Sequence, residues 1–149
     1  MQRPGAEGIG EHHFMDILQQ LKAEAEAEEV GVAIPIMQKN GEPYPGDPTM
    51  TVTGSDSEAV RAEEDRATQR SIQRGTKRIK TTAKHIADNR VRMAAAAVVE
   101  WTWTSEGQPF PCTPDNVRVM LASAPHILRQ VEEGIAAHAD FTTKPSTSL

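Results

Sequence analysis

The chain has 149 residues, of which 38% are hydrophobic and 4% aromatic, and its formal net charge is −5. This length is typical of one domain, but the low apolar content leaves a thin core, so some segments are expected to be solvated or to need a partner. The single cysteine, Cys112, excludes an intramolecular disulfide framework, and the lack of a long apolar run argues against a membrane span, which together indicate a cytoplasmic protein.

The N-terminal part is acidic and carries one helical pattern. Residues 1–30 hold seven acids and two bases. Residues 1–14 are rich in glycine and polar side chains, and we expect them to be a disordered leader before a single domain over residues 15–141. Apolar side chains at helical spacing then predict a short helix from about Asp16 to Glu28. Glutamates crowd the end of this helix and oppose its dipole, so we expect the end to fray.

Residues 30–54 carry the signals of a β-hairpin. Apolar, largely β-branched residues fill positions 32–37, and residues 50–53 alternate like a second strand. The turn signal Asn40-Gly41 and several prolines lie between them, which predicts a long irregular turn. Pro35 cannot donate a ladder hydrogen bond, so its strand is expected at an edge. A two-stranded hairpin is marginal by itself and must pack on another element.

A long helical segment is predicted after the hairpin. Ser55 and Glu58 match a capping box, and from there to Trp101 the chain has no proline and one glycine, Gly75. We therefore predict one long helix, or two helices that meet near Gly75. The second half is amphipathic and offers a contact surface. Its apolar positions are Ile79, Ala83, Ile86, Met93, Ala97 and Trp101.

The C-terminal third predicts a pair of helices. After a turn signal near residues 104–109, Thr113 caps a helix whose first residue is Pro114. A second helix restarts near Pro125, with Phe141 expected to anchor its end, and residues 142–149 are expected to be a disordered tail. The apolar stripe of this second helix is Ile127, Leu128, Val131 and Ile135. The predicted fold is α+β and predominantly α-helical, with an N-terminal β-hairpin, a long helical segment and a C-terminal helix pair.

No pattern in the chain indicates catalysis, a cofactor or a metal site. His12-His13 has no cysteine or carboxylate cluster beside it, whereas a metal site needs three or four converging ligands. Cys112 lacks a local base and an orienting group, so a small buried hydrophobic residue is the better interpretation. The chain also lacks a phosphate-binding glycine loop and a Gly-x-Ser-x-Gly elbow. We therefore expect a protein that is not an enzyme and uses no cofactor.

The strongest charged feature is a basic ridge within residues 66–78, where arginines recur every four residues and would share one helix face. Such a ridge can neutralise phosphates, yet no aromatic residue interleaves with it and the whole chain is acidic. A solvated face or an acidic protein partner is therefore favoured over nucleic acid. The chain's own acidic N-terminal helix is one such partner. The basic ridge consists of Arg66, Arg70, Arg74 and Arg78.

Both tryptophans lie at one junction, in the stretch "WTWTSEGQPFP". Tryptophan is costly to expose and is enriched at interfaces. The aromatic side chains are expected either to close the core where the long helical segment meets the C-terminal pair, or to form a partner surface, and different rings can serve different roles. The candidate partner-binding residues are Trp101, Trp103, Phe110, Ile86 and Met93.

The order of these segments resembles that of small tail assembly chaperones of tailed bacteriophages, of the siphophage and prophage type. The resemblance covers roughly residues 30–141. It runs from the hairpin through "VTGSDSEAV", "VVEWTW" and "EGQPFPCTPDNVRVML" to "APHILRQVEEGIAAHADF". The matching positions suit caps and turns rather than catalysis. They are Gly54, Asp56, Ser57, Trp101, Gly107, Phe110, Thr113, Pro114, Asn116, Pro125, Gln130, Val131 and Phe141.

The resemblance implies a non-enzymatic role. Chaperones of this family bind the long hydrophobic tape measure protein in the host cytoplasm, keep it soluble, and leave as tail tube subunits replace them. Many are also made as a longer frameshifted product whose extra domain recruits the tail tube protein. The implied partners are thus the tape measure protein and the tube protein, and a homo-oligomer is compatible with this role.

Two other functions stay open. The same helices and hairpin would serve a structural virion component, such as a tail or head-tail protein that contacts other virion proteins and remains in the particle. A nucleic-acid-binding regulator would instead use the basic residues within 66–84.

Overall fold

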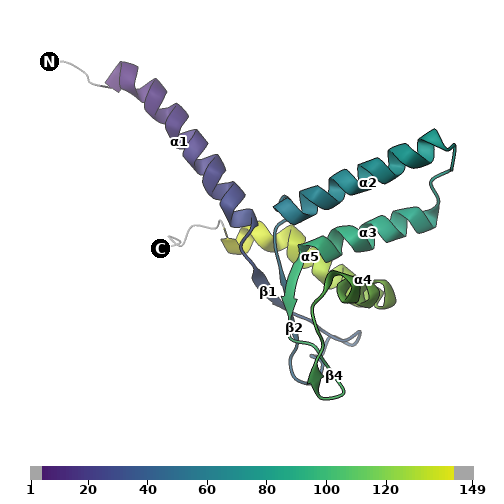
Figure 1. Ribbon diagram of the computed structural model, residues 1–149. Coiled ribbons are helices and arrows are strands. Elements are labelled where there is room, and N and C mark those ends of the chain that lie inside the picture. The colour runs from purple at the N-terminus through teal and green to yellow at the C-terminus, as the bar shows by residue number, and fades with distance from the viewer. Residues whose placement is uncertain (1–4, 143–149) are drawn as a thin grey trace.

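The computed structural model describes residues 5–142, with side chains from Asp16 onward (Figure 1). This part of the chain is mainly helical, with a small antiparallel sheet, which confirms the predicted α+β class. Helices α2 to α5 pack with the sheet in one body, whereas α1 projects away from it. The helices are α1 (Gly5–Glu28), α2 (Glu58–Thr76), α3 (Ala83–Ala97), α4 (Pro114–Ser123) and α5 (Pro125–Thr142). The strands are β1 (Val32–Pro35), β2 (Thr49–Val52), β3 (Val98–Trp101), β4 (Thr104–Ser105) and β5 (Gln108–Pro109).

Helix α1 is longer than the sequence predicts. It has 24 residues, which corresponds to about 36 Å of helix. Residues 5–14, expected to be disordered, are helical. The stretch has no proline to interrupt the helix, and its three glycines weaken the helix without breaking it. Residues 1–4 of the expected leader and residues 143–149 of the expected tail lie outside the described residues.

The C-terminal end of α1 is held by hydrogen bonds, and the prediction that it frays is wrong. The Glu28 carboxylate accepts from the Asp56 N–H (3.1 Å), and the Glu29 carboxylate accepts from the Glu58 N–H (2.7 Å). These donors lie at the start of α2, where the helix dipole favours negative charge. The acids that oppose the dipole of α1 therefore stabilise the neighbouring helix. A Cβ at Gly54 would lie 1.6 Å from Glu28 Oε2, so a larger residue there would displace the Glu28 carboxylate from its bond to Asp56.

The predicted hairpin is confirmed, but the sheet has a third strand. β1 pairs antiparallel with β2, with Ile34 opposite Met50. β3 pairs antiparallel with the other edge of β2, where Met50 lies opposite Trp101, so the strand order is β1-β2-β3. The sequence places residues 98–101 at the end of a helix, and that prediction is wrong. β-branched Val98 and Val99 suit a strand, and pairing with β2 outweighs the helical pattern that precedes them.

The long turn between β1 and β2 is anchored to α5 by the side chain of Gln130, which bonds to the turn backbone. Gln130 accepts from the Met37 N–H (2.7 Å) and donates to the Met37 carbonyl (2.8 Å). The tip contains Gly41 with φ +85°, a left-handed conformation that suits glycine in the predicted Asn40-Gly41 turn. The proline-rich turn is thereby fixed to the last helix.

The helical segment is a hairpin of two helices, α2 and α3. The N-cap of α2 is Ser57, whose hydroxyl accepts from the Val60 N–H, rather than the predicted Ser55. The break lies just after Gly75, as one of the two predicted alternatives has it, because α2 ends at Thr76 with Lys77 as its C-cap. Arg78 has φ +58°, and the next N–H, of Ile79, donates to the Arg74 carbonyl, which is the hydrogen-bond pattern of a Schellman C-cap.

The C-terminal region forms as predicted at its helix starts. Thr113 caps α4 by accepting from the Asn116 N–H, and Pro114 is the first helical residue. The turn before it is a tight hairpin of β4 and β5, with Glu106 and Gly107 at positive φ. Phe141 is 68% exposed, so the prediction that it anchors the end of α5 is wrong.

The core lies where the sheet meets α3, α4 and α5. The apolar stripe predicted for α5 faces it, with Val131 fully buried. The buried core cluster consists of Ile36, Met50, Val52, Ala94, Ala95, Val98, Trp101, Val117, Leu121, Ile127, Leu128 and Val131. None of the helices within residues 5–142 has both the length and the hydrophobicity needed to cross a bilayer.

Candidate partner-binding site

Trp101 lies in the core rather than on a partner-facing surface. It ends β3, is 7% exposed, and its Nε1 donates to the Phe110 carbonyl (2.5 Å). Its ring stacks on that of Phe110, with centroids 5.3 Å apart. This fixes the loop that contains β4 and β5 onto the sheet. Of the two roles expected for the aromatic junction, Trp101 therefore takes the core role.

Trp103 packs at the edge of the same junction. It is partly buried and makes an edge-to-face contact with Tyr44, whose hydroxyl lies 2.5 Å from His126 Nε2. Trp103 Nε1 is buried and has no hydrogen-bond partner among the described residues. The ring closes the contact between the long turn, the β4–β5 loop and α5. Its role in partner binding stays a prediction.

Ile86 and Met93 do not share one buried face. Ile86 is 63% exposed, and Ile79 and Ala83 are exposed as well, so the N-terminal half of the predicted amphipathic face does not pack on the body. Met93 is partly buried and lines a hollow of about 290 Å³ between α2, α3 and α5. The prediction of one continuous apolar face over residues 79–101 is wrong because the packing against the core starts only near Val91.

Arg78 does not share a helix face with the rest of the basic ridge. Arg66, Arg70 and Arg74 lie on α2, but Arg78 follows the end of this helix in a left-handed conformation. The prediction that all four arginines share one helix face is therefore wrong for Arg78.

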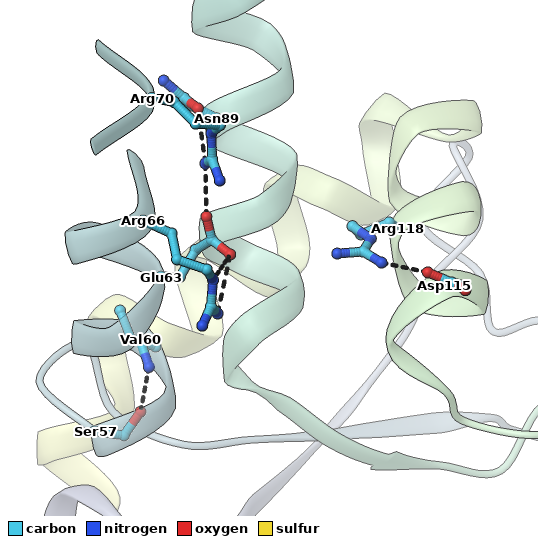
Figure 2. Close-up of polar contacts among 8 residues, drawn as sticks. All are labelled: Ser57, Val60, Glu63, Arg66, Arg70, Asn89, Asp115 and Arg118. Carbon is cyan, nitrogen blue, oxygen red and sulfur yellow. Dashed lines mark hydrogen bonds and ion pairs between the residues drawn. The ribbon is translucent and has the colours of Figure 1, made fainter. Parts of the chain in front are cut away.

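Glu63 binds two arginines of the ridge from the buried side of α2 (Figure 2). It is 4% exposed, and its carboxylate accepts from Arg70 (2.7 Å) and from Arg66 (3.2 Å). Arg70 also donates to Asn89 on α3. Burial raises the pKa of Glu63, but the hydrogen bonds and charges of Arg70 and Arg66 outweigh it and hold the pKa below its ordinary value. Part of the ridge therefore connects α2 to α3 rather than presenting free charge.

An open groove lies between α2 and α4, with α3 and β3 beneath it, and we call it the alanine groove. Its volume is about 490 Å³. Four alanines from α2 and α3 line it, and small side chains let another backbone approach closely. Figure 2 shows Glu63 and Arg66 on one side and Arg118 on the other, with α3 between them. Its lining includes Ala59, Ala62, Ala95, Ala96, Arg66, Arg92 and Arg118.

The alanine groove contains one cysteine, whose surroundings do not activate it. Its cysteine, Cys112, is partly buried, and burial together with the charge of Glu100 raises the pKa of its thiol, which disfavours a reactive thiolate. Arg118 pairs with Asp115 on the rim. Among the described side chains, from Asp16 to Thr142, no group of three or more His, Cys, Asp or Glu is placed to hold a metal, and His12-His13 lies outside this range.

Sequence reasoning missed Glu63 and the alanine groove. Glu63 precedes Arg66 by three residues and Arg70 by seven, a spacing that places all three on one helix face and could have indicated the ion pairs. The groove had no comparable signal, because it forms only when α2, α3 and α4 come together. Tyr44 and His126 were missed for the same reason, since they meet only in the folded chain.

Comparison with known proteins gave no match, whether with a protein-family model, a curated protein or a solved structure.

Proposed function

We propose that this chain is a non-enzymatic tail assembly chaperone of a tailed bacteriophage, which binds the tape measure protein in the host cytoplasm during tail morphogenesis. The alanine groove is the observation that carries the proposal on the structural side. It is open, has a volume of about 490 Å³ and runs beside well-packed helices that would hold it in shape. The sequence resemblance supplies the identity of the partner.

The groove suits a helix of a long hydrophobic protein. An apolar helix packs best where small side chains let the two backbones approach, and Ala62 and Ala96 are partly exposed within the groove. Arg66, Arg92 and Arg118 would meet acidic residues at the edges of the apolar stripe of that helix. The tape measure segment recognised in this way is an amphipathic helix with acids beside its apolar face.

Co-expression with the tape measure protein of the same phage tests the proposal. The double variant Ala59→Trp/Ala62→Trp fills the groove from positions that are not in the core, so it should fold but fail to keep the tape measure protein in solution. The matched control is Ala122→Trp, on an exposed part of α4 outside the groove. Equal recovery of soluble tape measure protein with all three chains, after circular dichroism has shown equal folding, would contradict the proposal.

A structural virion component would use the same surfaces but stay in the particle. Quantitative mass spectrometry of purified virions and infected-cell lysate separates these functions. A chaperone gives abundant peptides from residues 30–141 in the lysate and none in virions. A fixed copy number in virions would instead identify a structural subunit that contacts other virion proteins.

A further inference from the structure

The α1 helix presents an apolar stripe that the body of the protein does not cover. Ile17, Leu18 and Leu21 are 44%, 47% and 54% exposed, and they lie on adjacent helical positions. Only the last turn, with Ala27 and Glu28, is partly buried. Residues 16–29 hold five acids and one base, so the stripe lies on a negatively charged helix. We call residues 16–26 the acidic arm.

The loop end of the α2–α3 hairpin is basic and carries exposed apolar side chains, so it is complementary to the acidic arm. Residues 71–87, which we call the basic tip, hold five lysines and arginines and no acid. Ile72, Ile79 and Ile86 lie within this tip and are 55%, 50% and 63% exposed. Lys84 pairs with Asp88 just outside the tip, and the net charge of the tip remains strongly positive. Exposed isoleucines beside such charge are costly in a free monomer and are typical of a surface that binds a partner.

A hollow in the basic tip is lined by both apolar and positively charged side chains. Its volume is about 260 Å³. Arg74 lines it, and Arg74 Nε is buried without a hydrogen-bond partner among the described residues. An apolar side chain with a nearby carboxylate would fill this hollow and pair with its cations. The lining is Arg70, Gln73, Arg74, Lys77, Ile79 and His85.

The acidic arm does not reach the basic tip of its own chain. Figure 1 shows α1 and the α2–α3 hairpin leaving the body in different directions, with their outer ends far apart. The link from α1 to the body is fixed by the bonds of Glu28 and Glu29 to the start of α2. A tip that meets the arm therefore has to come from another molecule.

We propose that the acidic arm of one copy of this chain docks on the basic tip of a second copy. The stripe of Ile17, Leu18 and Leu21 would cover the exposed isoleucines, and Glu24 would lie near Arg74 and Lys77. The contact joins two different patches, so it is reciprocal in a two-fold dimer or head-to-tail in a larger assembly. This inference does not rest on the proposed function.

Sedimentation velocity of the full chain over a range of concentrations tests the proposal. The wild-type chain should self-associate, and salt should weaken the association because the charges are exposed. Leu18→Ser/Leu21→Ser should weaken it by about tenfold or more, since it removes the apolar contact without touching the core. The matched control is Val119→Ser, which changes an equally exposed apolar residue on α4 and should leave the association unchanged.

Charge exchange identifies the two partners in the contact. Glu24→Lys/Glu26→Lys reverses the net charge of the arm, and Lys77→Glu/Arg78→Glu/Lys80→Glu reverses that of the tip. Each variant alone should remain monomeric, because its arm and tip then carry like charges. An equimolar mixture should associate again, because each arm then meets an oppositely charged tip. All five positions are exposed, so the variants should fold.

Three results would overturn the proposal. The first is a wild-type chain that stays monomeric at every concentration. An arm that folds back onto its own tip would give this result too. The second is unchanged association after Leu18→Ser/Leu21→Ser. The third is a mixture of the charge variants that stays monomeric. None of these substitutions alters the alanine groove. Tape measure binding by the same variants therefore tests the proposed function separately from self-association.

Discussion

Trp101 and Phe110 are joined twice, by a stacked contact between their rings and by a hydrogen bond from the Trp101 indole to the Phe110 carbonyl. The first residue ends the third strand of the sheet, and the second lies just after the β4–β5 loop. The pair thus closes this loop over the core, which explains why the largest side chains of a polar chain lie so close together in sequence.

Replacing Trp101 should destabilise the fold. Trp101→Ala removes a buried ring and should cost about 3–5 kcal/mol, whereas Trp101→Phe keeps an aromatic ring and should lose about 1 kcal/mol from the hydrogen bond, beyond any repacking cost. Urea unfolding measures both values. A loss for Trp101→Ala below about 1 kcal/mol, together with lost partner binding, would place the ring at an interface instead.

The two arginines that bind Glu63 should differ in importance. Arg70→Ala leaves the buried carboxylate without its closest cation and should cost about 2–3 kcal/mol. Arg66→Ala serves as the control, because the Arg66 side chain is 59% exposed and its loss should cost less than about 1 kcal/mol. Urea unfolding at neutral pH compares the two variants, and equal losses would show that Glu63 does not depend on Arg70.

Acid should weaken the fold through Glu63. Its folded-state pKa lies below the ordinary value of 4.5, so near that value the unfolded chain binds more protons than the folded chain. The stabilisation is therefore complete above pH 4.5 and is lost as the pH falls through the folded-state pKa. Glu63→Gln should lose less stability than the wild type between neutral pH and about pH 3. Parallel unfolding curves would show that Glu63 does not contribute.

Arg78 should be replaceable by glycine with a gain in stability. Its φ of +58° is costly for a residue with a Cβ, by roughly 1–2 kcal/mol, and glycine removes this cost while losing some conformational entropy on folding. Thermal unfolding of Arg78→Gly should therefore show a net gain of about 0.5–1 kcal/mol. Arg78→Ala is the control, because it removes the same side chain but keeps the Cβ. A gain with both variants would point to relief of charge repulsion in the basic tip instead.

Features that depend on neighbouring residues were predictable, and features that depend on distant segments were not. The Asn40-Gly41 turn, the Thr113 cap and the start of α5 follow from local residue types. The strand character of residues 98–101 does not, because the alanine run before it favours a helix and only the pairing with β2 decides otherwise. The effect of the Glu28 charge was likewise not predictable. Glu28 ends α1, where its charge opposes the helix dipole, but its carboxylate binds the Asp56 N–H at the start of α2, where negative charge is favourable.

The same contrast applies to the candidate surfaces. The burial of Trp101 was one of two outcomes open to the sequence, since residue type alone cannot distinguish a core ring from an interface ring. The periodic spacing of arginines predicted a shared face, which holds along α2 and ends where the helix ends, at Arg78. The alanine groove had no signal in any single segment.

The central position of β2 has a consequence for how the chain folds. Its first neighbour, β1, is close in sequence, but its second neighbour, β3, arrives only after both helices of the α2–α3 hairpin. Closing so long a loop carries an entropic cost that precedes the gain from strand pairing. We therefore expect the docking of β3 beside β2 to be a late and rate-limiting step, and a nascent chain that ends before Val98 to lack a stable sheet. During synthesis on the ribosome, the β1–β2 hairpin would therefore become stable only after β3, which ends at Trp101, has been made and has paired with β2.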